Sequence, residues 1–149
     1  MKCLIDKDIK YFLQYIIMNK TTYLSSFNDH FEEMIEDVKR IFPEDKDIKN
    51  VHAYLNGIMS VNTGKIHKIF RKNVILVYRN HIINDDIDFF LNRDYSDEVS
   101  ENYKDTINDK LEILKVTIRK MDKSEQNKIL QYLKNLIILS DLYINSKVI

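Results

Sequence analysis

Residues 27–43 read FNDHFEEMIEDVKRIFP, and this stretch decides the expected fold. Its apolar residues recur at intervals of three and four, as on one face of an α-helix: Phe27, Phe31, Met34, Val38 and Ile41. The opposite face is acidic. Ser25 or Ser26 can cap the start of this helix, and Pro43 ends it. The segment predicts an amphipathic helix that buries one face.

The same spacing recurs on both sides of this segment. Upstream, Ile9, Phe12, Leu13, Ile16 and Ile17 predict a helix that starts near residue 6 or 8 and ends at a polar break over 19–22. Downstream, helices are expected over about 47–60 and 65–83. A short helix is expected around 87–91, and 92–101 is expected to be a long loop.

Two long helices are predicted to close the chain, between Tyr103 and Ile144. Asp122 and Glu125 between them form a capping box, in which each side chain binds a free backbone N–H of the other residue. Because the connecting turn is short and polar, the two helices are expected to form an antiparallel hairpin. This hairpin is the predicted spine of the fold.

Composition supports an all-α domain. The 149 residues include two Gly and one Pro, whereas small strand-rich domains need many tight turns built from such residues. A chain of this length fits one domain, residues 1–149. The expected architecture is therefore a compact bundle of six or seven helices with a long C-terminal helical hairpin.

Cysteine content and hydropathy bear on the compartment. Cys3 is the single cysteine, so an internal disulfide is impossible and a free thiol in a reducing compartment is expected. No signal peptide is recognisable at the start. The longest apolar stretch, 136–144, is interrupted by Ser140 and Asp141 and is far shorter than the ~20 residues that span a bilayer. We expect a cytoplasmic protein, or one inside a virus particle, with no membrane partner.

The motifs of common catalytic and metal sites are missing. His30 and Glu33 share a helix face, but no further ligand is apparent beside them. Gly64-Lys65 lacks the earlier glycine and the Ser or Thr of a phosphate-binding loop, and 86–88 lacks the spacing of a calcium loop. The sequence predicts no enzyme, no catalytic residue, no cofactor and no metal site.

Charge is segregated although the net charge is zero. Between residues 65 and 81 the helix carries no acidic residue and a basic stripe: Lys65, Lys68, Arg71, Lys72 and Arg79. The stripe could bind phosphates of a nucleic acid, dock an acidic partner protein, pack against the acidic segment of this same chain, or simply be the solvated face of an amphipathic helix. Residues 85–109, by contrast, are strongly acidic.

Two apolar features could contact a partner protein. Phe89, Phe90 and Leu91, followed by Asp94 and Tyr95, would form an aromatic contact inside an acidic rim if exposed, and would fasten the following loop to the core if buried. The last helix has a wide apolar face over residues 136–142. That face suits either the central helix of the bundle or a homodimer contact.

Three segments together resemble a small family of uncharacterised helical proteins encoded by giant nucleocytoplasmic DNA viruses: residues 27–31 with 41–48, 86–91 with 94–96, and 132–136 with 139–140. The resemblance implies a viral origin and offers no catalytic residues. Together with the charge segregation, it predicts a non-enzymatic interaction protein that docks to a viral or host protein. The alternative is a nucleic-acid-associated protein that uses the basic stripe.

Overall fold

The computed structural model describes residues 2–88 and 107–146, with the side chains of residues 2–9 and 11–20 excepted. Every regular element in these ranges is helical: α1 (Lys2–Ile41), α2 (Lys46–Val61), α3 (Lys65–Phe70), the π-helical turn η1 (Arg71–Ile75), α4 (Leu76–Ile83), α6 (Ile107–Arg119) and α7 (Lys123–Ser146). Because α3, η1 and α4 are continuous, these elements form five helices. The all-α prediction is confirmed. The number six or seven stays a prediction, since residues 89–106 lie outside the described ranges.

Helix α1 runs for 40 residues without the interruption expected at 19–22, and the separate N-terminal helix was a wrong prediction. Asn, Lys and Thr lower helix propensity by well under ~1 kcal/mol each, and neither Gly nor Pro occurs there to end the helix. Ser25 and Ser26 consequently lie inside α1 rather than at a helix start. The helix ends at Ile41, two residues before Pro43, as predicted.

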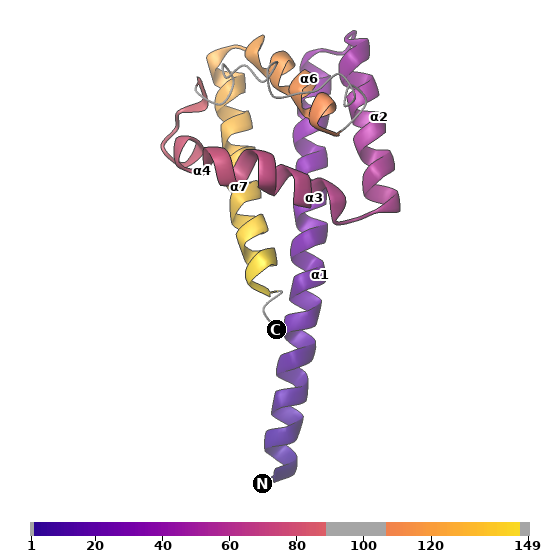
Figure 1. Ribbon diagram of the computed structural model, residues 1–149, viewed down its shortest axis with the longest axis vertical. Coiled ribbons are helices and arrows are strands. Elements are labelled where there is room, and N and C mark those ends of the chain that lie inside the picture. Colours follow the sequence, from indigo (N-terminus) through magenta and orange to yellow (C-terminus); the bar gives the residue numbers. More distant parts are fainter. Residues whose placement is uncertain (1, 89–106, 147–149) are drawn as a thin grey trace.

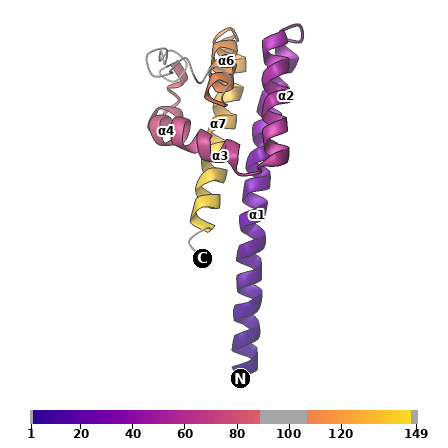
Figure 2. The same cartoon turned by 45° about the vertical axis from the view of Figure 1, so that its right-hand side comes forward.

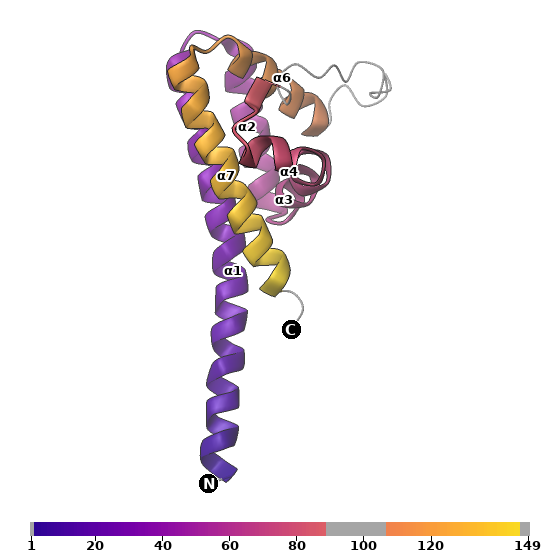
Figure 3. The same ribbon diagram turned by 90° about the vertical axis from the view of Figure 1, so that its left-hand side faces the viewer.

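The long α1 and α7 lie side by side and form the spine of the molecule (Figures 1 and 3). The predicted C-terminal hairpin is wrong, because α7 packs mainly on α1, whereas α6 packs mainly on α2 and runs obliquely from the top of α7. The capping box itself is confirmed. Asp122 N–H donates to Glu125 Oε1 at 3.0 Å, and Glu125 N–H donates to Asp122 Oδ1 at 2.8 Å. The capping box determines where α7 begins, but it does not determine the direction in which α6 runs relative to α7.

The continuous α3–η1–α4 helix crosses the front of α1 and α7 (Figure 1), and α2 runs beside α1 (Figure 2). The core lies between these helices and includes the fully buried Phe27, Phe31, Ile35, Tyr78 and Leu136. Asp45 starts α2 by accepting hydrogen bonds from the N–H groups of Asp47 and Ile48 at 2.9 and 3.2 Å. Of the wide apolar face of α7, Leu136 and Ile137 are buried, and Ile138 and Leu142 are exposed.

The N-terminal end of α1 projects beyond the end of α7 and beyond every other element drawn with it (Figures 1, 2 and 3). We call residues 2–20 of α1 the arm. Among the α1 residues whose side chains are described, the buried ones begin at Phe27, which marks where the helix enters the body. No helix in the described ranges is both long enough and apolar enough to cross a bilayer.

A tyrosine–carboxylate hydrogen bond joins α7 to α1, since Tyr132 Oη donates to Asp37. Burial of the phenol and this bond raise the pKa of Tyr132 to about 12. A phenol whose pKa is higher in the folded state stabilises the fold below the unfolded pKa of ~10 and loses that contribution as the pH rises to about 12. We expect Tyr132→Phe to lower the free energy of unfolding by about 1 kcal/mol at neutral pH.

The same change should remove a tyrosinate that forms at about pH 12 in an ultraviolet absorbance titration, leaving eight of the nine tyrosines to titrate. An unaltered titration curve would show that Tyr132 does not carry the raised pKa.

Candidate functional site

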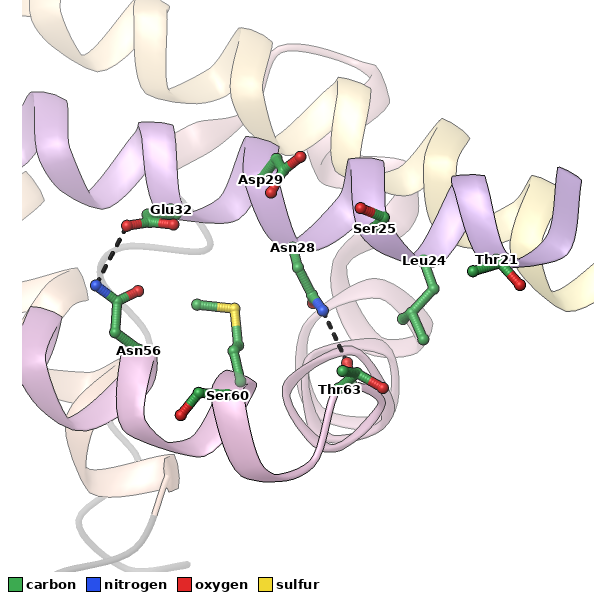
Figure 4. A pocket seen from close by; sticks show the side chains of 10 residues that line it. Thr21, Leu24, Ser25, Asn28, Asp29, Glu32, Asn56, Ser60 and Thr63 are labelled. Atoms are coloured by element: carbon green, nitrogen blue, oxygen red, sulfur yellow. Dashed lines mark hydrogen bonds between the residues drawn. The ribbon is translucent and has the colours of Figure 1, made fainter. Parts of the chain in front are cut away.

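A polar groove of about 560 Å³ lies between α1 and α2. Figure 4 shows its walls, which are mostly short polar side chains: Thr21, Leu24, Ser25, Asn28, Asp29, Glu32, Asn56, Met59, Ser60 and Thr63. Asn28 Nδ2 donates to the carbonyl oxygen of Thr63 at 2.8 Å and so holds the loop after α2 against α1. Glu32 and Asn56 face each other across the groove at its other end.

Glu32 and Asn56 belong to a cluster that joins four side chains from two helices. Glu32 and Glu36 are four residues apart on α1, and His52 and Asn56 are four residues apart on α2, so each pair shares one helix face. Asn56 Nδ2 lies 3.2 Å from Glu32 Oε1 and 3.1 Å from His52 Nε2. Glu32 Oε1 and His52 Nε2 are 3.6 Å apart. One ligand atom each from Glu32, Glu36 and His52 lie within 4.8 Å of one another.

Lys39 completes the surroundings of the imidazole. Its Nζ lies 3.2 Å from His52 Nδ1. An ammonium group can only donate, so the contact with Lys39 needs Nδ1 as the acceptor, whereas the contact with Asn56 Nδ2 needs Nε2 as the acceptor. A neutral imidazole has one acceptor nitrogen, so only one of these two contacts can be a hydrogen bond at a time. The His52 side chain is only 12% exposed, which keeps this arrangement largely away from solvent.

A second polar centre connects α3, η1 and α4 to α7 through Asp141. Arg79 binds this carboxylate with both terminal nitrogens, at 2.6 Å to Oδ2 and 2.7 Å to Oδ1. Arg71 Nη1 donates to Asp141 Oδ1 at 2.9 Å and to Ser140 Oγ at 2.8 Å. Ser140 Oγ also lies 2.7 Å from Nε2 of the buried His67.

The π-helical turn makes this double contact possible. Eight residues of a regular α-helix would rotate Arg79 about 80° away from Arg71 around the helix axis. Inserting one residue in η1 reduces the rotation to about 20°, so both guanidinium groups reach the same carboxylate. The hydrogen bond from Arg79, assisted by that from Arg71, lowers the pKa of Asp141 to about 2 against the burial that raises it.

The contact between Ser140 and His67 resembles part of a hydrolase triad, but its surroundings differ. Ser140 is fully buried, and Asp141 binds two arginines instead of orienting the imidazole. The rings of Phe27 and Tyr143 stand edge-on to His67, with centroids 4.9 and 4.8 Å away. These contacts fix the packing of α3 on α1 and α7, and we assign the pair a structural role.

The structure divides the predicted basic stripe in two. Lys65, Lys68 and Lys72 are exposed, whereas Arg71 and Arg79 are half-buried and bind Asp141. The five cations therefore do not form one free surface.

The predicted contact residues Phe89, Phe90, Leu91, Asp94 and Tyr95 lie outside the described residues. Helix α3 begins at Lys65, directly after Gly64, where the helix over about 65–83 was expected to start.

The cluster of Glu32, Glu36, His52 and Asn56 was not predicted from the sequence. A signal existed in the two pairs spaced by four, one on each predicted helix. Without knowing that α1 and α2 face each other at this register, the two pairs have no reason to be combined.

Comparisons with protein families, curated proteins and solved structures found no match for this chain.

Proposed function

We propose that this chain is a non-enzymatic interaction protein that self-associates by docking its arm onto the arm of a second copy. The observation that carries the proposal is the projection of α1 beyond the body (Figure 1). Most of the stability of a helix in a protein comes from packing one of its faces against another surface. The arm has apolar positions on one helical face, and such a face normally packs against another surface.

A second copy suits the sequence of the arm. In an antiparallel pair centred on Leu13, the two leucines lie opposite each other and Ile9 of one copy lies opposite Ile17 of the other. The same register brings Asp6 of each copy opposite Lys20 of the other, in line with Leu13 at the two ends of the apolar stripe. A charged residue at a core position of a helix pair costs stability but fixes its register, and opposite charges would favour this register over a shifted one.

The first test is the oligomeric state of Leu13→Glu, measured by sedimentation equilibrium over a range of protein concentrations. Two like charges would face each other at the centre of the pair, so we expect the dimer Kd to rise about a hundredfold or more. Gln14→Glu is the matched control, because it adds the same charge about 100° around the helix from Leu13, outside the row formed by Ile9, Leu13 and Ile17, and should leave the dimer intact.

The register is tested separately by charge exchange at the ends of the arm. Asp6→Lys alone should weaken the dimer, and adding Lys20→Asp should restore it, because the exchanged pair is again complementary. A wild-type chain that remains monomeric at all concentrations would refute self-association. A dimer that Leu13→Glu and Gln14→Glu affect equally would refute the arm as its interface.

Two further parts of the proposal rest on sequence. The resemblance to proteins of giant DNA viruses supports a role in a virion or in a viral or host complex of the infected cell. Nucleic-acid association through Lys65, Lys68 and Lys72 is the weaker alternative, because Arg71 and Arg79 already bind Asp141. It would be favoured by binding that weakens steeply with salt and is lost when the three lysines are reversed in charge.

A further inference from the structure

We propose that Glu32, Glu36, His52 and Asn56 form a binding site for a divalent transition-metal ion of the zinc type, which ties α1 to α2. The proposal does not depend on self-association through the arm. It rests on the positions of four potential ligands, two from each helix, at the end of the polar groove that Glu32 and Asn56 line.

The distances match those between ligand atoms of a tetrahedral site. Ligand atoms about 2.0–2.2 Å from a zinc ion are about 3.3–3.6 Å from one another. Glu32 Oε1, His52 Nε2 and the Asn56 amide lie 3.1, 3.2 and 3.6 Å apart and form a triangle of nearly that size. A half-turn of the Asn56 amide places Oδ1 where Nδ2 now lies, so the third corner becomes an oxygen ligand.

Glu36 supplies the fourth ligand. It lies one helical turn after Glu32, and one of its carboxylate oxygens is within 4.8 Å of the ligand atoms of Glu32 and His52. Glu36 is exposed, so its side chain is free to approach a bound ion. Two carboxylates would neutralise the two charges of the ion.

The donor set favours a transition metal over magnesium or calcium. Imidazole and carboxylate together suit zinc and related ions, whereas magnesium and calcium take oxygen ligands. The groove that Glu32 and Asn56 line offers the ion a path from solvent (Figure 4).

Lys39 makes a specific prediction possible. When Nε2 of a histidine binds a metal, Nδ1 carries the proton and donates it to an acceptor. In the structure Nδ1 instead faces the ammonium of Lys39 at 3.2 Å, and an ammonium group cannot accept that proton. Metal binding must therefore displace Lys39, whose positive charge also opposes the ion. Removing Lys39 should strengthen binding, which an adventitious surface site elsewhere would not show.

The test is calorimetric titration of the full chain with zinc chloride. Relative to wild type, we expect His52→Gln and Glu32→Gln each to weaken binding more than about tenfold, and Lys39→Met to tighten it about tenfold. His30→Gln is the matched control. His30 lies 3.6 Å from Glu33 on the same helix as Glu32, and its loss should leave zinc binding unchanged.

Thermal melting of each variant in excess chelator separates loss of metal from loss of folding. In the same assay, zinc should raise the melting temperature of the wild type and leave that of His52→Gln unchanged. The proposal is wrong if His30→Gln weakens binding as much as His52→Gln, if Lys39→Met does not tighten it, or if magnesium displaces zinc at comparable concentration.

Discussion

Phe31→Ala is expected to lower the free energy of unfolding by about 3–5 kcal/mol, which is a large part of the stability of a chain of this size. Phe31 is fully buried where α1 meets α3. Its ring stands 5.6 Å from that of Phe70 in an edge-on contact and 6.2 Å from that of Phe27 in a stacked one. Truncation removes these contacts and leaves a cavity that the surrounding helices can fill only in part.

Urea denaturation followed by circular dichroism measures this effect. Leu76→Ala is the control, since Leu76 is a large apolar side chain of α4 that is 64% exposed, and its loss should change stability by less than about 1 kcal/mol. Similar destabilisation by the two substitutions would mean that Phe31 is not at the centre of the core. This outcome would contradict the packing of α3 on α1.

The helices could be predicted from sequence because their signals are local. The spacing of Phe27, Phe31, Met34 and Val38 fixes which face of α1 is buried, and all four are buried in the structure. Pro43 and the capping box of Asp122 and Glu125 mark helix ends by chemistry that acts over three or four residues. Polar residues within α1 gave a false boundary, because they lower helix propensity without removing a backbone hydrogen bond.

The arrangement of the helices could not be predicted in the same way. A short turn between α6 and α7 allowed a hairpin, yet the apolar face of α7 is buried mainly against α1, about 100 residues earlier in the chain. Leu136 of α7 is fully buried in the core. Which of several apolar faces pack together depends on the fit of side chains across helices, which periodicity does not report.

The polar sites depend on this arrangement as well. From the sequence, Asp141 was noted only because it interrupts an apolar stretch. Arg71 and Arg79 were assigned to the basic stripe. Their ion pairs require both the crossing of α4 over α7 and the extra residue of η1. The cluster of Glu32 and His52 likewise exists only because α2 folds back along α1.

Asp141→Asn is expected to lower the free energy of unfolding by about 2 kcal/mol at neutral pH. This lies between the ~3–5 kcal/mol for breaking a buried ion pair and the ~1 kcal/mol or less for an exposed pair, because the Asp141 side chain is 35% exposed. An asparagine has nearly the same shape, so the change removes the charge that both guanidinium groups face while leaving the packing of α4 on α7 in place.

The pH dependence identifies the ion pairs as the cause. The pKa of Asp141 is about 2 in the folded protein and near 3.8 without its partners, so its stabilising effect is complete above about pH 4 and is lost as the pH falls to about 2. The difference between wild type and Asp141→Asn should therefore shrink over this range in denaturation curves. Asp29→Asn removes an exposed carboxylate of α1 and serves as the control for the loss of one negative charge. A difference that is constant with pH would assign the effect of Asp141→Asn to packing.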